Sequence, residues 1–111
     1  MPSHSAHLAR VFQGLADPTR MAVLEQLSRG PASVSELARP YNMALPSFTQ
    51  HLSVLEDCRL VRSRKSGRVR TYQLVPRQMK LAQDWLERQR AMWERRLNQL
   101  DEYLMQLKEQ S

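Results

Sequence analysis

The segment SVSELARPYNMALPSFTQHLSVLEDCRLVRSRKSGRVRTYQL, residues 33–74, contains the pattern that decides the fold. Its first half predicts two helices separated by a short turn. Ser33–Glu36 has the Ser-x-x-Glu spacing of a capping box, which begins a helix that must end before Pro40. A second helix is expected from Pro46 to about Cys58, because apolar residues recur there on one face while polar residues occupy the other.

The second half of the segment changes to the pattern of a β-hairpin. Two extended runs, residues 60–64 and 69–74, are rich in β-favouring residues such as Val69 and Tyr72. Between them, Gly67 supplies the permissive backbone that a tight turn requires. The segment therefore predicts a short helix, a turn, a polar-faced helix and a hairpin.

Two further helices are predicted on the N-terminal side. Apolar residues recur at helical spacing from Leu8 to Leu15 and again from Met21 to Leu27. The second of these helices has a clear start, because Asp17 can cap exposed amides and the proline after it suits the first helical position.

One long helix is predicted on the C-terminal side, from Pro76 to about Lys108, where neither Pro nor Gly interrupts the chain. Apolar residues seven positions apart mark one face of it: Met79, Leu86, Trp93, Leu100 and Leu107. A helix of some thirty residues is about 45 Å long, more than the core of so small a domain can cover. We therefore expect part of it to pack on a helix from outside the monomer.

Taken in chain order, α-α-α-α-β-β-α, these elements predict a winged helix-turn-helix. The fold class is mainly α with a small β-hairpin and a long C-terminal dimerisation helix. A length of 111 residues bounds the chain to one domain, residues 1–111, with residues 76–108 as the dimerisation helix.

Positive charge is concentrated in one stretch. Between Asp57 and Asp84 the chain has no acidic residue but eight of its 17 Lys and Arg, and the net charge of the whole chain is +6. Such a stretch favours a polyanion as partner, and double-stranded nucleic acid is the commonest one. The alternative is a solvated loop whose charges only keep the protein soluble.

The pattern assigns candidate DNA contacts to two elements. Short polar side chains on the helix that enters the major groove contact base edges, and the hairpin holds the phosphate backbone. The candidates on the recognition helix are Pro46, Ser47, Thr49, Gln50 and His51. The candidates on the wing are Arg64, Lys65, Arg68 and Arg70.

Five segments in this order resemble the ArsR/SmtB-type bacterial transcriptional regulators. They are FQGLADPTR (12–20), SELA (35–38), QHLSVLE (50–56), LV (60–61) and GRVRTYQL (67–74). The resemblance implies a sequence-specific double-stranded DNA-binding regulator that represses an operon from an inverted-repeat operator and leaves DNA when an effector binds. It also implies a homodimer built from the first and last helices, with the apolar residues Leu8, Val11, Phe12, Leu86, Trp93, Leu97, Leu100 and Leu104 at the interface.

The chain departs from the family pattern in three places. Ala38 and Pro40 stand where arsenic- and lead-sensing relatives carry Cys-x-Cys, and no His or Cys follows Cys58, so we expect neither usual metal site and no cofactor. Ala44 replaces the usual Ser at the start of the recognition helix, and Arg59 replaces a Gly that commonly ends it.

Other classes of function remain as alternatives. One is a metal- or small-molecule-responsive sensor with a non-standard site and an unknown effector; the other is a protein-interaction module that uses the long helix. An enzyme is not expected, because the chain has neither a phosphate-binding glycine loop nor a recognisable nucleophile with its base. A single cysteine, no apolar run long enough to span a membrane and no signal-peptide pattern predict a cytoplasmic protein.

Overall fold

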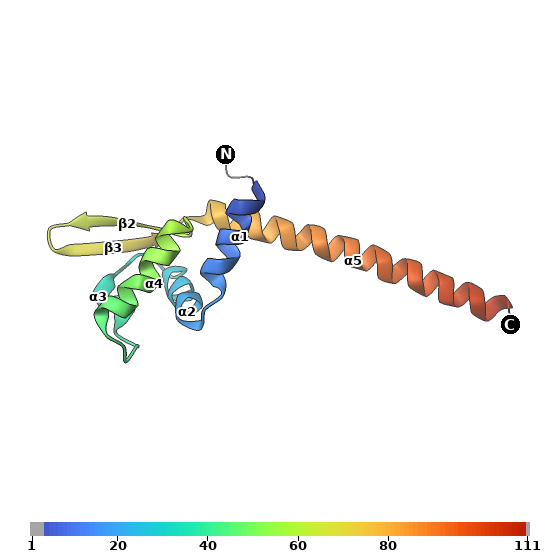
Figure 1. The fold of residues 1–111 in the computed structure, drawn as a ribbon, viewed down its shortest axis with the longest axis horizontal. Coiled ribbons are helices and arrows are strands. Elements are labelled where there is room, and N and C mark those ends of the chain that lie inside the picture. Colours follow the sequence, from blue (N-terminus) through green and yellow to red (C-terminus); the bar gives the residue numbers. More distant parts are fainter. Residues whose placement is uncertain (1–3, 111) are drawn as a thin grey trace.

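The computed structural model of the chain describes residues 4–110 and confirms a winged helix-turn-helix architecture. Its elements are α1 (His4–Leu15), α2 (Pro18–Leu27), β1 (Ala32–Ser33), α3 (Val34–Ala38), α4 (Leu45–Asp57), β2 (Val61–Ser66), β3 (Val69–Leu74) and α5 (Pro76–Gln110). Figure 1 shows α1 to α4 gathered into one head, with the β2–β3 hairpin projecting from one end and α5 from the other.

The sheet has one strand more than the sequence predicted. Its order is β1-β3-β2, with every neighbouring pair antiparallel. The extra strand, β1, pairs Ala32 with Tyr72 and Ser33 with Thr71. Two residues are too few to show a strand periodicity, so this strand could not be recognised from the sequence.

The hairpin turn is also tighter than expected. β2 continues to Ser66, and only Gly67 and Arg68 remain between the strands. Gly67 has a φ of +63° at the first central position, as in a type II′ turn, which matches the twist of the flanking strands.

Two side-chain caps fix the helix starts that the sequence predicted. Asp17 accepts a hydrogen bond from the amide of Arg20 at 3.0 Å, and this bond is the main cause that lowers the pKa of the Asp17 carboxyl. At α3, the Ser33 hydroxyl accepts from the Glu36 amide at 3.2 Å while the Glu36 carboxylate accepts from the Ser33 amide at 3.1 Å. The bond from the Ser33 amide is the main cause that lowers the pKa of the Glu36 carboxyl.

One hydrophobic core joins the helical head to the sheet. Its most deeply buried side chains come from α1 to α4 and from the base of the hairpin: Val11, Val23, Leu37, Phe48, Leu52, Leu55, Leu60 and Val61. Val11 has no exposed surface and Leu8 only 8% in the single chain, and their assignment to a dimer interface stays a prediction. Both side chains are already used by the packing of their own chain.

The N-terminal part of α5 also belongs to this head. Ala82 is buried, and the ring of Trp85 meets the ring of Phe12 on α1 edge to face, with 5.5 Å between centroids. Beyond that contact α5 leaves the head, and the molecule measures 75 Å along its longest axis. Within residues 4–110, no helix is long and apolar enough to cross a membrane.

The recognition helix α4 begins and ends without the residues that stabilise such ends best. The N-cap residue Ala44 makes no side-chain hydrogen bond. After the C-terminal end, Arg59 has a φ of +59°, in the left-handed region that glycine tolerates best. The substitution of Gly by Arg that the sequence indicated therefore lies at a position where the backbone is strained.

We expect Arg59→Gly to raise the free energy of unfolding by about 0.5–1 kcal/mol. Relief of the left-handed backbone outweighs the extra entropy that glycine adds to the unfolded chain. Urea unfolding at a fixed protein concentration measures the change. The matched control is Arg39→Gly, because Arg39 has the ordinary helical φ of −53° and should lose stability. Equal losses in both variants would contradict the strain at Arg59.

We expect Asp17→Ala to lower the free energy of unfolding by about 1 kcal/mol at neutral pH through loss of the α2 cap. Because the pKa of Asp17 is lowered from 3.8 in the folded chain, its ionised form stabilises the fold above that value, and the effect is lost as the pH falls through the folded-state pKa. The gap between the two proteins should therefore narrow in acid, toward the value that an uncharged capping oxygen gives. Asp17→Asn, which keeps a capping oxygen without a charge, should retain most of the stability; urea titrations between pH 7 and pH 3 test both.

Candidate nucleic-acid interface

The exposed face of α4 carries the side chains that the sequence assigned to base contact. Phe48, Leu52 and Leu55 are buried, which turns the opposite face of the helix to the solvent. Ser47 and Gln50 lie on that face one helical turn apart and are exposed. Their hydroxyl and amide groups make no hydrogen bond to any residue in the range 4–110, so both can bind an external partner.

The other three candidates on α4 are placed differently. Pro46 is exposed in the first turn of the helix. Thr49 is half-buried, and its hydroxyl donates to the carbonyl of Pro46 at 3.0 Å. His51 is half-buried and turned toward α2 rather than away from the head. The structure thus brings Pro46, Ser47 and Gln50 together at the surface and directs His51 inward.

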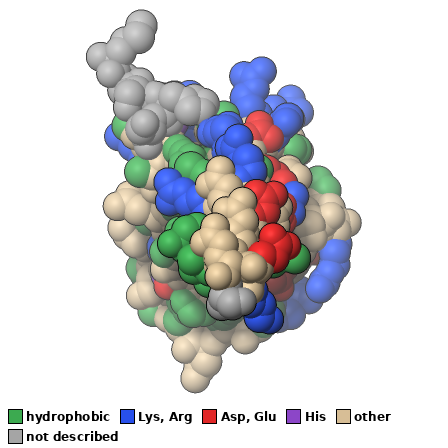
Figure 2. Space-filling model, turned by 90° about the vertical axis from the view of Figure 1, so that its right-hand side faces the viewer, with side chains coloured by type: hydrophobic (Ala, Val, Ile, Leu, Met, Phe, Trp, Pro, Cys, Tyr) green, Lys and Arg blue, Asp and Glu red, His purple; other side chains and the backbone are tan. Residues whose placement is uncertain are grey.

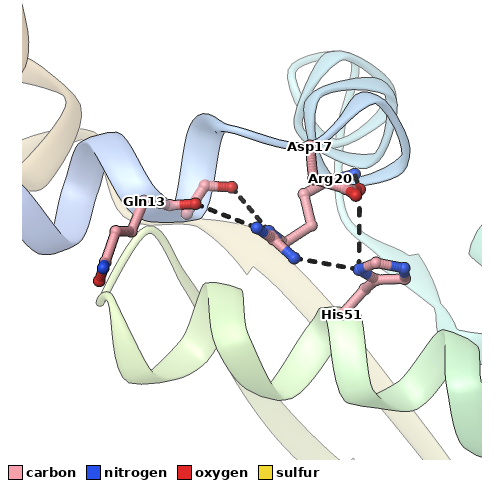
Figure 3. Close-up of polar contacts among 5 residues, drawn as sticks. Gln13, Asp17, Arg20 and His51 are labelled. Atoms are coloured by element: carbon pink, nitrogen blue, oxygen red, sulfur yellow. Dashed lines mark hydrogen bonds and ion pairs between the residues drawn. The ribbon is translucent and has the colours of Figure 1, made fainter.

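His51 belongs to a polar junction with two other residues, which are Arg20 in α2 and Asp17, the N-cap of α2 (Figure 3). The Nη1 atom of Arg20 lies 3.2 Å from Nδ1 of His51, and Oδ2 of Asp17 lies 3.7 Å from the same nitrogen. A guanidinium only donates hydrogen bonds, so the 3.2 Å contact with Arg20 favours the tautomer in which Nδ1 accepts and the ring proton lies on Nε2. That Nε2–H is the donor that His51 retains for another partner.

Arg20 was not predicted as a site residue, although it ends the segment FQGLADPTR (12–20). Besides its contact with His51, its Nε donates to the carbonyl of Gly14 at 2.9 Å and its Nη2 to the carbonyl of Gln13 at 3.0 Å. These carbonyls lie in the last turn of α1 and lack partners within the helix. One arginine therefore joins α1, α2 and α4. No sequence signal marks such a role, because two of its acceptors lie in α1 and the third, His51, lies in α4, 31 positions away.

Gly14 of α1 also lies close to the side chains of two residues that follow α4. A Cβ added to Gly14 would lie 2.9 Å from the Leu60 side chain and 3.2 Å from Sγ of Cys58. Cys58 is thus packed against α1, and burial is the main cause that raises the pKa of its thiol. Cys58 therefore acts as a small packing residue in this conformation.

The strand register divides the basic side chains of the wing between its two faces. Lys65 pairs with Arg70, and Arg64 pairs with Thr71 at the next position, so the two pairs project from opposite faces of the hairpin. Arg68 occupies the turn at the tip. All four predicted wing residues are exposed.

Within residues 4–110, Arg70 is the one predicted wing residue with a polar partner. Its Nη1 donates to the Ser63 hydroxyl at 2.8 Å, and that hydroxyl donates to the Glu56 carboxylate at 2.8 Å. This relay connects the wing to the end of α4. It directs Arg70 toward the recognition helix, while Arg64 faces away from it.

The face of the wing that carries Arg64 also contains a basic groove. The groove has a volume of about 530 Å³ and is lined by Pro31, Arg62, Ser63, Arg64, Thr71 and Gln73. Arg62 was not predicted as a wing contact, although it lies within the basic stretch. Alternation along β2 places Arg62 beside Arg64 on the same face.

The predicted interface residues on α5 form an exposed apolar stripe. Leu86, Trp93, Leu97, Leu100 and Leu104 are each exposed over more than half of their surface. Figure 2, which looks along α5 from its C-terminal end, shows hydrophobic side chains on one flank of the helix and acidic ones on the other. Phe12, also predicted for this interface, is partly buried against Trp85.

In the part of the chain that the structure describes, no cluster of three His, Cys, Asp or Glu side chains is arranged to hold a metal ion. His51 already contacts Arg20 through Nδ1.

Comparison with known proteins supports a DNA-binding fold. Residues 15–64 match a family model described as a helix-turn-helix domain. The HTH-type transcriptional regulator Rv2034 of Mycobacterium tuberculosis is 49% identical over 60% of this chain and 63% of its own length. A probable mercury resistance operon repressor of Streptomyces lividans is 36% identical over 63% of this chain and 56% of its own length. The chain thus aligns with less than two thirds of the length of these curated relatives.

Solved structures agree over a longer range. A crystal structure of an ArsR family transcriptional regulator, RHA00566, has 50% sequence identity and a TM-score of 0.79, and the match covers 85% of this chain and 97% of that chain. The homodimeric winged helix-turn-helix domain of Mb0332 from Mycobacterium bovis has 26% identity and a TM-score of 0.60, covering 80% of this chain and 81% of that one. On the identity and coverage of the first of these structures, the chain belongs to the ArsR family of transcriptional regulators.

Proposed function

We propose that the chain is a homodimeric, sequence-specific double-stranded DNA-binding regulator that represses its target operon in the cytoplasm. The observation that carries this proposal is the free polar face of α4 beside a strongly basic wing. The Streptomyces lividans relative, named an operon repressor, supports the direction of regulation. Nothing in this role calls for catalysis.

Base contact is assigned to Ser47 and Gln50, with Pro46 at the edge of the same surface. A glutamine amide can bind adenine through two hydrogen bonds in the major groove, and a serine hydroxyl can donate to or accept from several bases. Thr49 is assigned a supporting role, because its hydroxyl is bonded to the carbonyl of Pro46. His51 is assigned to a phosphate through the N–H at Nε2.

Backbone contact is assigned to the wing. Arg68 at the tip, with Lys65 and Arg64 on the two faces, can neutralise phosphates of the groove beside the recognition helix. The positive charge of Arg70 is partly compensated by the Glu56 carboxylate, to which it is connected through the Ser63 hydroxyl. We therefore assign Arg70 a smaller share of the phosphate contacts than the other wing residues. The wing then sets the register in which α4 meets the bases.

Dimerisation is assigned to the exposed stripe of α5 together with Phe12 of α1. An apolar stripe of this kind is typical of a helix that packs on another helix. The 76–108 segment would thus be the dimerisation helix of one domain spanning residues 1–111. Two recognition helices related by a two-fold axis fit an inverted repeat whose half-sites lie about 34 Å apart.

We expect Arg68→Ala to weaken DNA binding and to reduce the slope of log affinity against log salt by about 0.9 per chain, since one phosphate contact is lost. Fluorescence anisotropy at several salt concentrations, on a duplex chosen by selection from random DNA, measures both quantities. The matched control is Arg88→Ala, which removes an exposed charge from α5 far from the wing. An unchanged slope for the wing variant would remove Arg68 from the interface.

We expect Leu97→Glu to convert a dimer into a folded monomer, because it places a charge in the apolar stripe of α5. Sedimentation equilibrium measures the mass and circular dichroism the helix content. Asn98→Glu adds the same charge at the next position, which lies outside the stripe, and should leave the dimer intact. A wild-type protein that sediments as a monomer would refute the dimer itself.

A further inference from the structure

A cavity beside the base of the wing has no role in the proposed DNA contacts. It lies where β3 passes into α5 and has a volume of about 430 Å³, within the range of small-molecule sites. The residues that line it come from the position before β2, the end of β3, the link after it and the first two turns of α5: Leu60, Leu74, Val75, Pro76, Arg77, Met79, Lys80 and Gln83. All of them lie within the described part of the chain.

The lining combines an apolar surface with positive charge and contains no acidic residue. Leu60 is 1% exposed and belongs to the core, so the cavity borders rigid, packed structure. Val75 donates its amide to the carbonyl of Leu60 at 2.9 Å, which fixes the backbone on this side. Apolar contact is therefore available from Leu60, Leu74 and Met79.

Two cations border the apolar part from the first turns of α5. Among residues 4–110, Arg77 has no hydrogen bond or ion pair. Lys80 has only an ion pair of 3.3 Å with Asp84, and both side chains are well exposed. Such exposed pairs are weak, so a bound anion can replace Asp84 at little cost.

We propose that this cavity binds a small amphipathic monoanion. Its carboxylate or sulfonate would pair with Arg77 and Lys80, and its acyl or aromatic body would cover Leu60, Leu74 and Met79. A neutral apolar molecule would leave both cations unused, and a nucleic acid would place phosphates against the apolar surface. Charge complementarity and the apolar lining together therefore favour this class of ligand.

The position of the cavity gives such a ligand a means of regulation. It lies at the joint between the wing and α5, and Met79 belongs to the heptad positions of the predicted dimerisation helix. A molecule bound there would contact both elements and so bias the angle between them. Binding itself does not depend on the proposed DNA function and can be measured without DNA.

The experiment uses the full chain labelled with ¹⁵N and decanoate as the probe, kept below its micelle concentration. We expect saturable shifts in the amide signals of Leu60, Leu74, Val75 and residues 77–83, with one probe bound per chain. 1-Decanol supplies the same tail without the charge, and acetate supplies the charge without the tail; both should bind much more weakly than decanoate.

Two matched double variants test the role of the charges. Arg77→Gln with Lys80→Gln should weaken decanoate binding by about fivefold or more, since two exposed ion pairs are lost. Arg88→Gln with Arg95→Gln removes two exposed charges from the same helix outside the cavity and should leave the affinity unchanged. Circular dichroism checks that both variants are folded.

Three results would overturn the proposal. Equal affinity for decanoate and 1-decanol would show that the cations do not select the ligand. Shifts confined to the stripe from Trp93 to Leu104 would place the probe on the exposed face of α5 instead. Absence of saturable shifts would show that the cavity is closed in solution, as expected if a second copy of the chain covers it.

Discussion

The arrangement of the head depends on one guanidinium group. Arg20 reaches the last carbonyls of α1, lies in the first turn of α2 and contacts His51 on α4. Charge-assisted hydrogen bonds are stronger than neutral ones, and a planar guanidinium offers donors in fixed directions. A lysine could not satisfy three acceptors from two other helices with the same geometry. The position of the recognition helix relative to α1 is therefore set by polar contacts as well as by the core.

This polar junction lies directly beside a contact that tolerates no additional atom. Gly14 approaches Leu60 and Cys58 so closely that a methyl group would require one of them to move. Interiors packed at this density transmit displacement rather than absorb it. A shift of α1 should therefore move Cys58 and Leu60 together, the residues that connect α4 to β2. Such a shift would link α1, which packs on α5, with both elements assigned to DNA.

Much of this architecture could be predicted from the sequence, because it depends on local signals. Asp17, the Ser33–Glu36 box and Pro76 each determine a helix start from residues within one turn of the chain. Gly67 likewise marks the hairpin turn, although the turn is shorter than predicted.

What could not be predicted depends on contacts between distant residues. β1 exists only because β3 lies beside it, and the buried state of Val11 follows from packing that periodicity does not specify. The inward direction of His51 depends on Arg20, 31 positions away in the sequence. The wing cations are divided between two faces by the pairing register of β2 and β3. That register depends on β2 continuing to Ser66, which the sequence did not predict.

Positive charge is concentrated toward one end of the longest axis, and this distribution affects how the molecule approaches a polyanion. The eight bases of the 58–83 stretch belong to the wing and its base, whereas the later part of α5, residues 86–110, has as many acidic as basic side chains. In the field of a duplex, such a distribution experiences a torque that turns the wing toward the phosphates before contact. Diffusional encounters would then begin largely in one orientation, and salt should slow them by shortening the distance over which that torque acts.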